Sequence, residues 1–309
     1  MEQIILTDDY QCKRPSVATI GFFDGVHRGH RFLIESVVRE AEKHSLASMV
    51  ITFDCHPRRV LGSEYNPRLL STNNEKAKLL SKTGIEQCVV LPFSEEMARL
   101  TAYDFMKKIL KELLGVKVLV IGYDNRFGHN RSEGFDDYVR HGREMGIEVL
   151  PSQSFRLHGI DVSSSVIRSL LGEGEIEMAE QCLGYPYFFS GKVVGGHRIG
   201  RELGFPTANI EPENMLKIIP APGVYSVKVR MEGRRETKHA MMNIGTRPTF
   251  DGSEQSLEVH IFDFNGDIYG CRISVAFMHK IRNEKRFASK EALMEQLEKD
   301  AETAKESFR

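Results

Sequence analysis

The chain has 309 residues, enough for two domains that each bury a hydrophobic core. Its 42 basic and 43 acidic side chains nearly cancel, so the net charge gives no reason to expect nucleic acid or an anionic membrane as a partner. We see no apolar run near the ~20 residues of a membrane span and no signal-peptide pattern. The five cysteines never show Cys-x-x-Cys spacing, which argues against a disulfide scaffold or zinc site and favours a reduced, cytoplasmic location.

Residues 16–150 alternate between short apolar runs and longer amphipathic segments. The apolar runs predict strands at residues 17–21, 47–53, 88–91, 118–122 and 146–150. The segments between them predict helices at about residues 27–44, 74–83, 102–114 and 134–145. This alternation predicts an α/β domain with a mostly parallel sheet and helices on both faces. Ligands of such sheets bind beyond the carboxyl ends of the strands, where the polar motifs of this half fall.

The first motif occupies residues 21–30, between a predicted strand and the helix that follows it. Its three glycines allow backbone N–H groups to approach an anion, and the helix start adds a partial positive charge. His27 and His30 are three residues apart, so both can face one ligand from the first helical turn. Two imidazoles at such a turn suit a phosphate chain. The alternative is a glycine-rich turn with two solvent-facing histidines.

Three further segments bring polar groups to the same edge of the sheet. Residues 53–57 end a strand with an aromatic ring and a histidine that could flank a planar ligand, although a plain strand-end turn is the alternative. Residues 122–128 and the nearby Arg131 supply arginine forks suited to phosphate, or ordinary surface charge. Residues 163–168 begin with a serine that serves first as an N-cap, and Arg168 follows one turn later within reach of a phosphate.

The pattern changes near residue 185, where we place a boundary between domains 1–185 and 186–309. Two short helices are predicted before it, at residues 165–171 and 176–182. After it, period-two alternation predicts strands at residues 188–194, 224–231, 238–244, 257–264 and 272–277, and a last helix covers about 290–305. Antiparallel strands in such a series predict a small barrel or sandwich.

The second half opens with a glycine-rich segment, residues 191–209. Five glycines, at 191, 195, 196, 200 and 204, allow a loop to fold over phosphates with backbone donors, although Gly-Lys-Ser/Thr of a Walker A loop is absent. Thr207 and Asn209 each supply an oxygen, and both can face one hard cation such as Mg²⁺ if Ala208 points away. An ordinary β-turn is the alternative.

Residues 257–262 alternate between apolar and other side chains. The apolar members predict the core face, so Glu258, His260 and Phe262 share the opposite face. A carboxylate there, beside a nucleotide loop, is a candidate general base for a hydroxyl group. A solvent-facing polar row on a sheet is the alternative.

Taken together, the first-half motifs resemble the adenylyltransferase module of the bacterial bifunctional riboflavin kinase/FAD synthetase family over about residues 15–180. The second half resembles the riboflavin kinase module of that family over about residues 186–305. The resemblance implies a Rossmann-like nucleotidylyltransferase domain followed by a six-stranded antiparallel Greek-key barrel with a terminal helix. It also implies that riboflavin is phosphorylated to FMN, and FMN adenylylated to FAD with release of pyrophosphate, with ATP as co-substrate and Mg²⁺ as cofactor.

The resemblance also implies roles for individual residues. In the first module, ATP would contact Gly21, Phe23, Asp24, Gly25, His27, His30, Arg131, Ser164 and Arg168. The flavin would contact Phe53, His56, Pro57, Asp124, Asn125 and Phe127. In the second module, ATP would contact Gly191, Gly195, Gly200, Pro206, Thr207, Asn209 and Tyr225, with Mg²⁺ on Thr207 and Asn209. The flavin there would contact Arg247, Glu258 and Arg286. The catalytic residues would be His27, His30 and Arg168 on the phosphates and Glu258 as the base.

Two alternatives to a bifunctional enzyme stay open at this point. Cys55 and Asn125 stand where the family pattern has proline and phenylalanine, so the chain could be a member specialised to one activity, with weaker adenylylation. The other alternative is a regulator that senses flavin nucleotides without turnover. The expected partners are small molecules, with neither nucleic acid nor membrane among them, and protein partners are left open.

Overall fold

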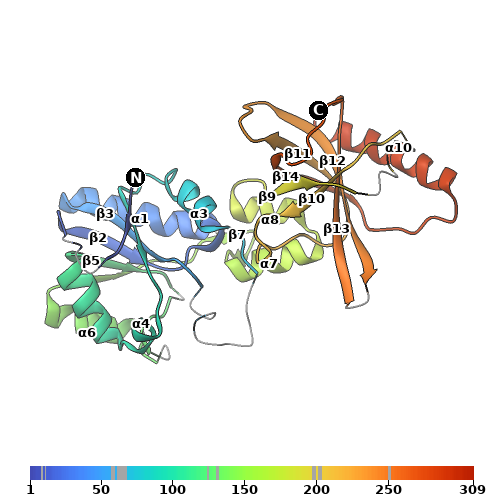
Figure 1. Ribbon diagram of the computed structural model, residues 1–309. Coiled ribbons are helices and arrows are strands. Elements are labelled where there is room, and N and C mark those ends of the chain that lie inside the picture. Colours follow the sequence, from blue (N-terminus) through green and yellow to red (C-terminus); the bar gives the residue numbers. More distant parts are fainter. Residues whose placement is uncertain are drawn as a thin grey trace. The chain divides into compact units, whose positions relative to one another are not determined.

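The computed structural model describes the chain except residues 8, 9, 11, 57–59, 61–67, 124, 130, 131, 197–199, 201–203, 250 and 251, together with the side chains of 247–249 and 252–254. The chain forms two compact units, Met1–Ser164 and Ser165–Arg309 (Figure 1). This division falls before the predicted boundary at residue 185, because the two short helices preceding that residue group with the second unit.

A sheet of six parallel strands forms the centre of the first unit, counted over the described residues. The strand order is β1-β4-β3-β2-β5-β6. The strands are β1 (Glu2–Ile5), β2 (Ser16–Ile20), β3 (Ala47–Phe53), β4 (Gln87–Leu91), β5 (Val116–Ile121) and β6 (Glu148–Pro151). All five strands predicted in this half are confirmed. The sixth, β1, is not among the predictions; it is a short edge strand with mostly exposed side chains.

Helices cover both faces of this sheet, as the alternation predicts. Figure 1 shows α1 and α3 on one side and α6 on the other. Ala18 and Ile20 of β2 belong to the core cluster that contains Phe105 and Tyr138, whereas the alternate residues of β2 face the side that α1 covers. The helices are α1 (Arg28–His44), α3 (Asn73–Leu80), α4 (Glu95–Arg99), α5 (Ala102–Asp104), the π-helix η2 (Phe105–Leu113) and α6 (Phe135–Met145). The predicted helix at residues 102–114 is therefore π-helical over most of its length.

The second unit is a closed antiparallel barrel with helices attached. Its strand order is β10-β13-β12-β11-β14-β9, which confirms the barrel prediction. The strands are β9 (Phe188–Val194), β10 (Ala208–Pro212), β11 (Gly223–Met231), β12 (Thr237–Thr249), β13 (Gly252–Ile261) and β14 (Arg272–Arg282). The helices are α7 (Ser164–Glu173), α8 (Ile176–Leu183) and α10 (Lys290–Glu306). Strand β10 was not predicted, because its residues were interpreted as a loop motif.

The second unit has two apolar regions. Large aromatic rings, including Tyr187, Phe189, Tyr225 and Phe277, are fully buried inside the barrel. A smaller cluster lies on the outside, where Met241 and Phe262 pack against Ala301 and Ala304 of α10. The terminal helix therefore covers part of the outer barrel surface, and this placement forms one wall of the site described below.

Candidate active sites

Three predicted motifs follow three neighbouring strands of the parallel sheet. Residues 21–30 follow β2, residues 53–57 begin at the last residue of β3, and residues 122–128 follow β5. Strands β3, β2 and β5 are adjacent and parallel, so their carboxyl ends lie at one edge of the sheet. The prediction that these motifs lie beyond the carboxyl ends of parallel strands is confirmed for their described residues, and binding of a ligand there stays a prediction.

The turn after β2 brings the two histidines together. It contains a short 3₁₀ segment, η1 (Asp24–Val26), in which Gly25 has a φ of 76° that favours glycine. His27 then caps α1, because its Nδ1 accepts a hydrogen bond from the His30 N–H at 3.3 Å. The two imidazole rings stack with centroids 3.6 Å apart. Since His27 is only 4% exposed, the alternative of two solvent-facing histidines does not describe it.

Asp24 stabilises this turn through buried hydrogen bonds. Its buried carboxylate accepts hydrogen bonds from the backbone N–H groups of Leu70 and Ser71, each at 2.9 Å. The Ser71 hydroxyl in turn accepts from the Gly25 N–H at 2.8 Å, and the Ser164 hydroxyl donates to the Asp24 carbonyl at 3.1 Å. Asp24 and Ser164 therefore shape the turn, and their direct contact with ATP stays a prediction.

The residues expected on the flavin side occupy different surroundings. The Phe53 ring meets Phe93 edge-on at 5.3 Å, and the His56 ring meets Phe22 edge-on at 4.8 Å. Asn125 uses its side-chain N–H to donate to the carbonyl of Ile20, the last residue of β2. The neighbouring loop is thus fastened to the strand that carries the histidine turn.

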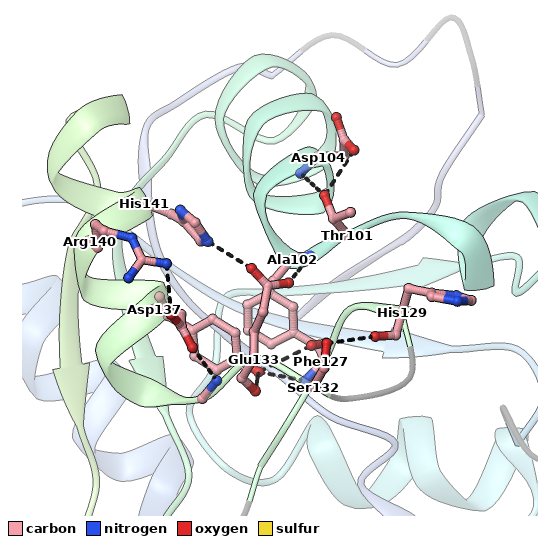
Figure 2. A network of polar contacts seen from close by, with 12 residues as sticks. Thr101, Ala102, Asp104, Phe127, His129, Ser132, Glu133, Asp137, Arg140 and His141 are labelled. Atoms are coloured by element: carbon pink, nitrogen blue, oxygen red, sulfur yellow. Dashed lines mark hydrogen bonds and ion pairs between the residues drawn. The ribbon is translucent and has the colours of Figure 1, made fainter.

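Phe127 packs inward, and a polar network joins Glu133, further along the chain, to Ala102 and His141 (Figure 2). Its ring stacks on Tyr138 with centroids 4.2 Å apart, and its N–H donates to the Tyr138 hydroxyl at 3.0 Å. Glu133 accepts a hydrogen bond from the Ala102 N–H at 2.8 Å and contacts the His141 Nε2 at the same distance. No motif in the sequence marks Glu133 or His141, because these contacts join separate helices to the loop.

The second site lies on the outer face of the barrel, beside α10. A cavity of about 290 Å³ is lined by Thr207, Asn243, Glu258 and Arg282 from the barrel and by Leu297 from the helix. Strand register explains how four of the strands contribute to it. Asn209 pairs with Glu258, Glu258 with Asn243, Asn243 with Val224, and Val224 with Arg282. Directly paired residues point to the same face, so these five residues form a row across five strands.

At the Glu258 position of this row, the predicted base contacts Thr207, a predicted metal ligand that lies just before β10. The Thr207 hydroxyl lies 3.4 Å from a carboxylate oxygen of Glu258. His260 lies on the same face of β13, and its Nδ1 is 2.8 Å from the Pro206 carbonyl oxygen. The buried residues Leu257, Val259 and Ile261 alternate with them, which confirms the predicted faces of this strand. Phe262 lies on the outer side too but is covered by α10.

Two glycines of the glycine-rich segment make room for this arrangement. A Cβ atom at Gly196 would overlap the side-chain amide of Asn209. A Cβ atom at Gly200 would overlap the backbone carbonyl of Phe205. A larger residue there would displace the backbone just before Thr207. Gly200 therefore requires glycine, because the obstacle there is backbone, whereas at Gly196 the obstacle is the end of the Asn209 side chain, which can turn aside.

The comparisons with known proteins match both halves of the chain. A family model for FAD synthetase matches residues 9–166, and a family model for riboflavin kinase matches residues 183–308. The chain belongs to the bifunctional riboflavin kinase/FMN adenylyltransferase family. The relative from Escherichia coli K12 bears that family name and is 39% identical over 292 residues, covering 94% of this chain and 92% of the relative. The Bacillus subtilis relative, with the same name, is 36% identical over 298 residues, covering 94% and 91%.

A solved structure also resembles the whole chain. The crystal structure of a protein named as a macrolide-efflux protein from Streptococcus pneumoniae is 33% identical, with a TM-score of 0.89, and 98% of each chain is covered. Among the helices that are described here, none is both long and apolar enough to cross a membrane.

Two residues that the family resemblance places at the ATP of the kinase site lie away from the cavity. Tyr225 is fully buried in the barrel interior, where its hydroxyl donates to the Ala221 carbonyl and burial raises its pKa. Gly191 lies in the barrel wall, where a Cβ would overlap Ile210 of β10. Neither residue lines the cavity, so their positions do not support direct contact with ATP.

The remaining predicted residues are placed as follows. Gly195 and Arg286 are exposed, and Arg286 lies between Lys285 and Phe287, which line the cavity. Arg168 lies on α7, one turn after Ser164. Pro57, Asp124, Arg131 and the side chain of Arg247 lie outside the described residues. The roles that the family resemblance gives to these residues stay predictions.

The donor groups near Glu258 fit Mg²⁺ when it arrives with a nucleotide. A hydroxyl and an amide, from Thr207 and Asn209, supply the hard oxygen ligands that this ion prefers. In the described part of the chain, no group of three or more His, Cys, Asp or Glu side chains could hold a metal ion.

Proposed function

We propose that this protein phosphorylates riboflavin to FMN with ATP, and then adenylylates FMN to FAD with release of pyrophosphate. The observation that carries the proposal is that each matched family region contains its own polar site, at the place its chemistry requires. One site lies at the carboxyl edge of a parallel sheet, and the other on the outer face of a barrel. The relatives bear the names of both activities, which favours the bifunctional enzyme over a specialised member or a regulator without turnover.

For the kinase reaction, Glu258 takes the proton from the 5′-hydroxyl of the ribityl chain. The freed oxygen attacks the γ-phosphorus of ATP, the bond to the β-phosphate oxygen breaks, and ADP leaves. Thr207 and Asn209 would hold Mg²⁺, which supplies positive charge to the phosphates when bound. The contact between Thr207 and Glu258 supports this assignment, because the base and the nucleotide must meet at one point. His260 supports Thr207 indirectly by binding the Pro206 carbonyl.

For the adenylyl transfer, a phosphate oxygen of FMN attacks the α-phosphorus of ATP, and pyrophosphate leaves. No covalent enzyme intermediate is required, so positioning and charge stabilisation supply the catalysis. His27 and His30 stand at the start of α1, where the helix dipole and the imidazoles can stabilise the charge on the phosphates. The role of Arg168 rests on the resemblance alone.

The cysteines support a reducing, cytoplasmic location for this activity. None of the five cysteines, all of which are described, forms a disulfide. Free cysteines are the ordinary state of proteins in the reduced cytoplasm.

One incubation tests the proposed function. The purified protein is mixed with riboflavin, ATP and MgCl₂, and samples are separated by chromatography with fluorescence detection. We expect riboflavin to decline, FMN to rise and then fall, and FAD to accumulate. Accumulation of FMN without FAD would support the specialised member instead, and unchanged riboflavin would support the regulator.

A further inference from the structure

We propose that Lys76 is a positioning residue of the adenylyltransferase site: its ammonium group fastens the loop after β2 to the end of β3. The inference rests on the proposed adenylyl transfer, and it adds a residue that no motif marks. The loop after β2 leads into the histidine turn, and the end of β3 begins the segment expected to face the flavin. Lys76 would therefore set the spacing between the two halves of the site.

The geometry of the contact is specific. Lys76 belongs to α3, which starts at a capping box between Thr72 and Glu75, and its side chain is only 4% exposed. Its Nζ donates to the Phe22 carbonyl at 3.2 Å, to the Phe53 carbonyl at 3.0 Å and to the Thr52 hydroxyl at 3.1 Å. One side chain of α3 thus contacts both the loop after β2 and the last two residues of β3.

The number of protons matches the number of acceptors. An ammonium group has three N–H donors and no acceptor, and Lys76 has three acceptors around it. The Thr52 hydroxyl gives its own proton to the Phe22 carbonyl at 3.1 Å, so its oxygen receives the bond from Lys76. A neutral amine has one donor fewer, so at most three of these four hydrogen bonds can then form. Those that remain also lose the strengthening that comes from the charge.

Aromatic contacts extend this link toward the predicted flavin segment. The Lys76 ammonium lies 4.3 Å from the centroid of the Phe22 ring, within the range of a cation–π interaction. The same ring meets His56 edge-on at 4.8 Å. The Phe22 ring therefore contacts both the Lys76 ammonium and the His56 imidazole. A shift of the ammonium would move the Phe22 ring and, through it, His56 in the segment predicted to contact the flavin.

Tight packing does not explain why a lysine occupies this position. A cavity of about 320 Å³ lies beside it, lined also by Phe53, Asp54 and Asn73. Burial of an ammonium is unfavourable, and it lowers the pKa of Lys76 to about 8. The ionisable groups that face it, Asp24 from η1, Asp54 and Cys55 just after β3, and Cys88 of β4, act in the opposite direction when they carry a negative charge. Burial raises the pKa of Cys88 to about 11, so that thiol stays neutral while Lys76 titrates.

The sign of the pH effect separates positioning from stability. Because the pKa of Lys76 is lower in the folded protein than in the unfolded chain, the unfolded state binds more protons between about pH 8 and 10.5. The contribution of this group to folding stability therefore rises with pH in that window. Deprotonation nevertheless removes one hydrogen bond of the link, so positioning predicts that FAD formation falls in the same window. If Lys76 only stabilised the fold, FAD formation would not fall while the stability contribution of Lys76 rises.

The test compares the wild-type protein with K76M, K76R and K78M from pH 6.5 to 9.5. Lys78 is the matched control, because it lies on the same helix but is exposed. FMN formation and FAD formation are measured separately, so the kinase of each variant serves as its internal reference. Thermal unfolding is recorded at each pH.

We expect wild-type FAD formation to fall with a midpoint near pH 8, relative to FMN formation. K76M should lose about 10- to 100-fold in kcat/KM for FMN adenylylation, the range that follows a misplacement of about 1 Å. K76R should retain more activity and lack the fall near pH 8, because arginine does not titrate there. K78M should match the wild type, and FMN formation should be unchanged throughout.

Two results would overturn the inference: wild-type FAD rates in K76M, or the same fall near pH 8 in both K76R and the wild type. If K76M fails to fold, the comparison of the K76R and wild-type pH profiles still tests the inference. Wild-type protein that forms FMN but no FAD at any pH would instead overturn the proposed adenylyl transfer itself.

Discussion

The ion pair between Arg282 and Asp300 should hold the terminal helix against the kinase cavity. Asp300 of α10 is 1% exposed, and its carboxylate accepts from the Arg282 Nε at 3.0 Å and Nη2 at 2.7 Å. The side chain of Gln296 donates to the same carboxylate at 2.9 Å. The substitution Asp300→Asn keeps the shape of the side chain and removes its charge.

The expected loss follows from the burial of both partners. Breaking a buried ion pair costs about 3–5 kcal/mol, because one charge is left uncompensated. Arg282 keeps 20% of its side chain exposed and also donates to the Asn283 carbonyl, so we expect the lower end, about 3 kcal/mol. If the helix detaches locally, its amides should exchange on the order of 10²-fold faster, since each 1.4 kcal/mol is a factor of ten.

Hydrogen exchange followed by mass spectrometry measures this directly, using peptides from α10 and reference peptides from the first unit. The matched control is Glu295→Gln on the same helix, because Glu295 pairs with Lys299 at the exposed surface. Such an exposed pair contributes little to stability, because solvent screens both charges. Equal protection of α10 in both variants would refute the reasoning that the buried pair anchors the helix.

Three further substitutions test the two sites separately. Glu258→Gln should reduce FMN formation about 10²–10⁴-fold and leave FAD formation from supplied FMN unchanged; measurable kinase activity near the wild-type rate would exclude Glu258 as the base. His27→Ala should lower FAD formation about 10²-fold while FMN formation persists, and equal loss of both rates in a folded variant would contradict separate sites. Asn125→Phe restores the residue of the family pattern, which the sequence suggests should improve FMN binding. Since Asn125 donates to the Ile20 carbonyl, we expect instead an apparent KM for FMN about fivefold higher, and a lower value would show that this bond is dispensable.

The parts of the fold that follow a local pattern were predictable from the sequence. The strands β2 to β6 are apolar runs, and β2 is buried at all five positions. Strand β10 escaped prediction because its first two residues, Ala208 and Asn209, belong to the segment that the sequence predicts as a glycine-rich loop. Strand β1 pairs on one side only, with β4, and most of its side chains are exposed.

The candidate sites were predictable where one motif carries them and not where distant residues meet. The paired histidines and the alternation around Glu258 are local signals. Lys76 binds groups 23 and 24 residues away in β3 and 54 residues away in the loop after β2, and Asp24 binds backbone 46 residues away. The burial of Tyr225 inside the barrel was not predictable for a related reason: it follows Val224, so the sequence does not indicate which of the two side chains faces the interior.

The row of residues that crosses the barrel has a consequence for how the length of this chain can vary. Each of five strands contributes one member, from Asn209 on β10 to Arg282 on β14. Adjacent residues of a strand point to opposite faces, so one residue inserted within a strand would turn its member of the row into the interior. Insertions in the connecting turns would leave every pairing in place. Related chains that keep this site should therefore gain and lose residues between the strands and keep the spacing within them fixed.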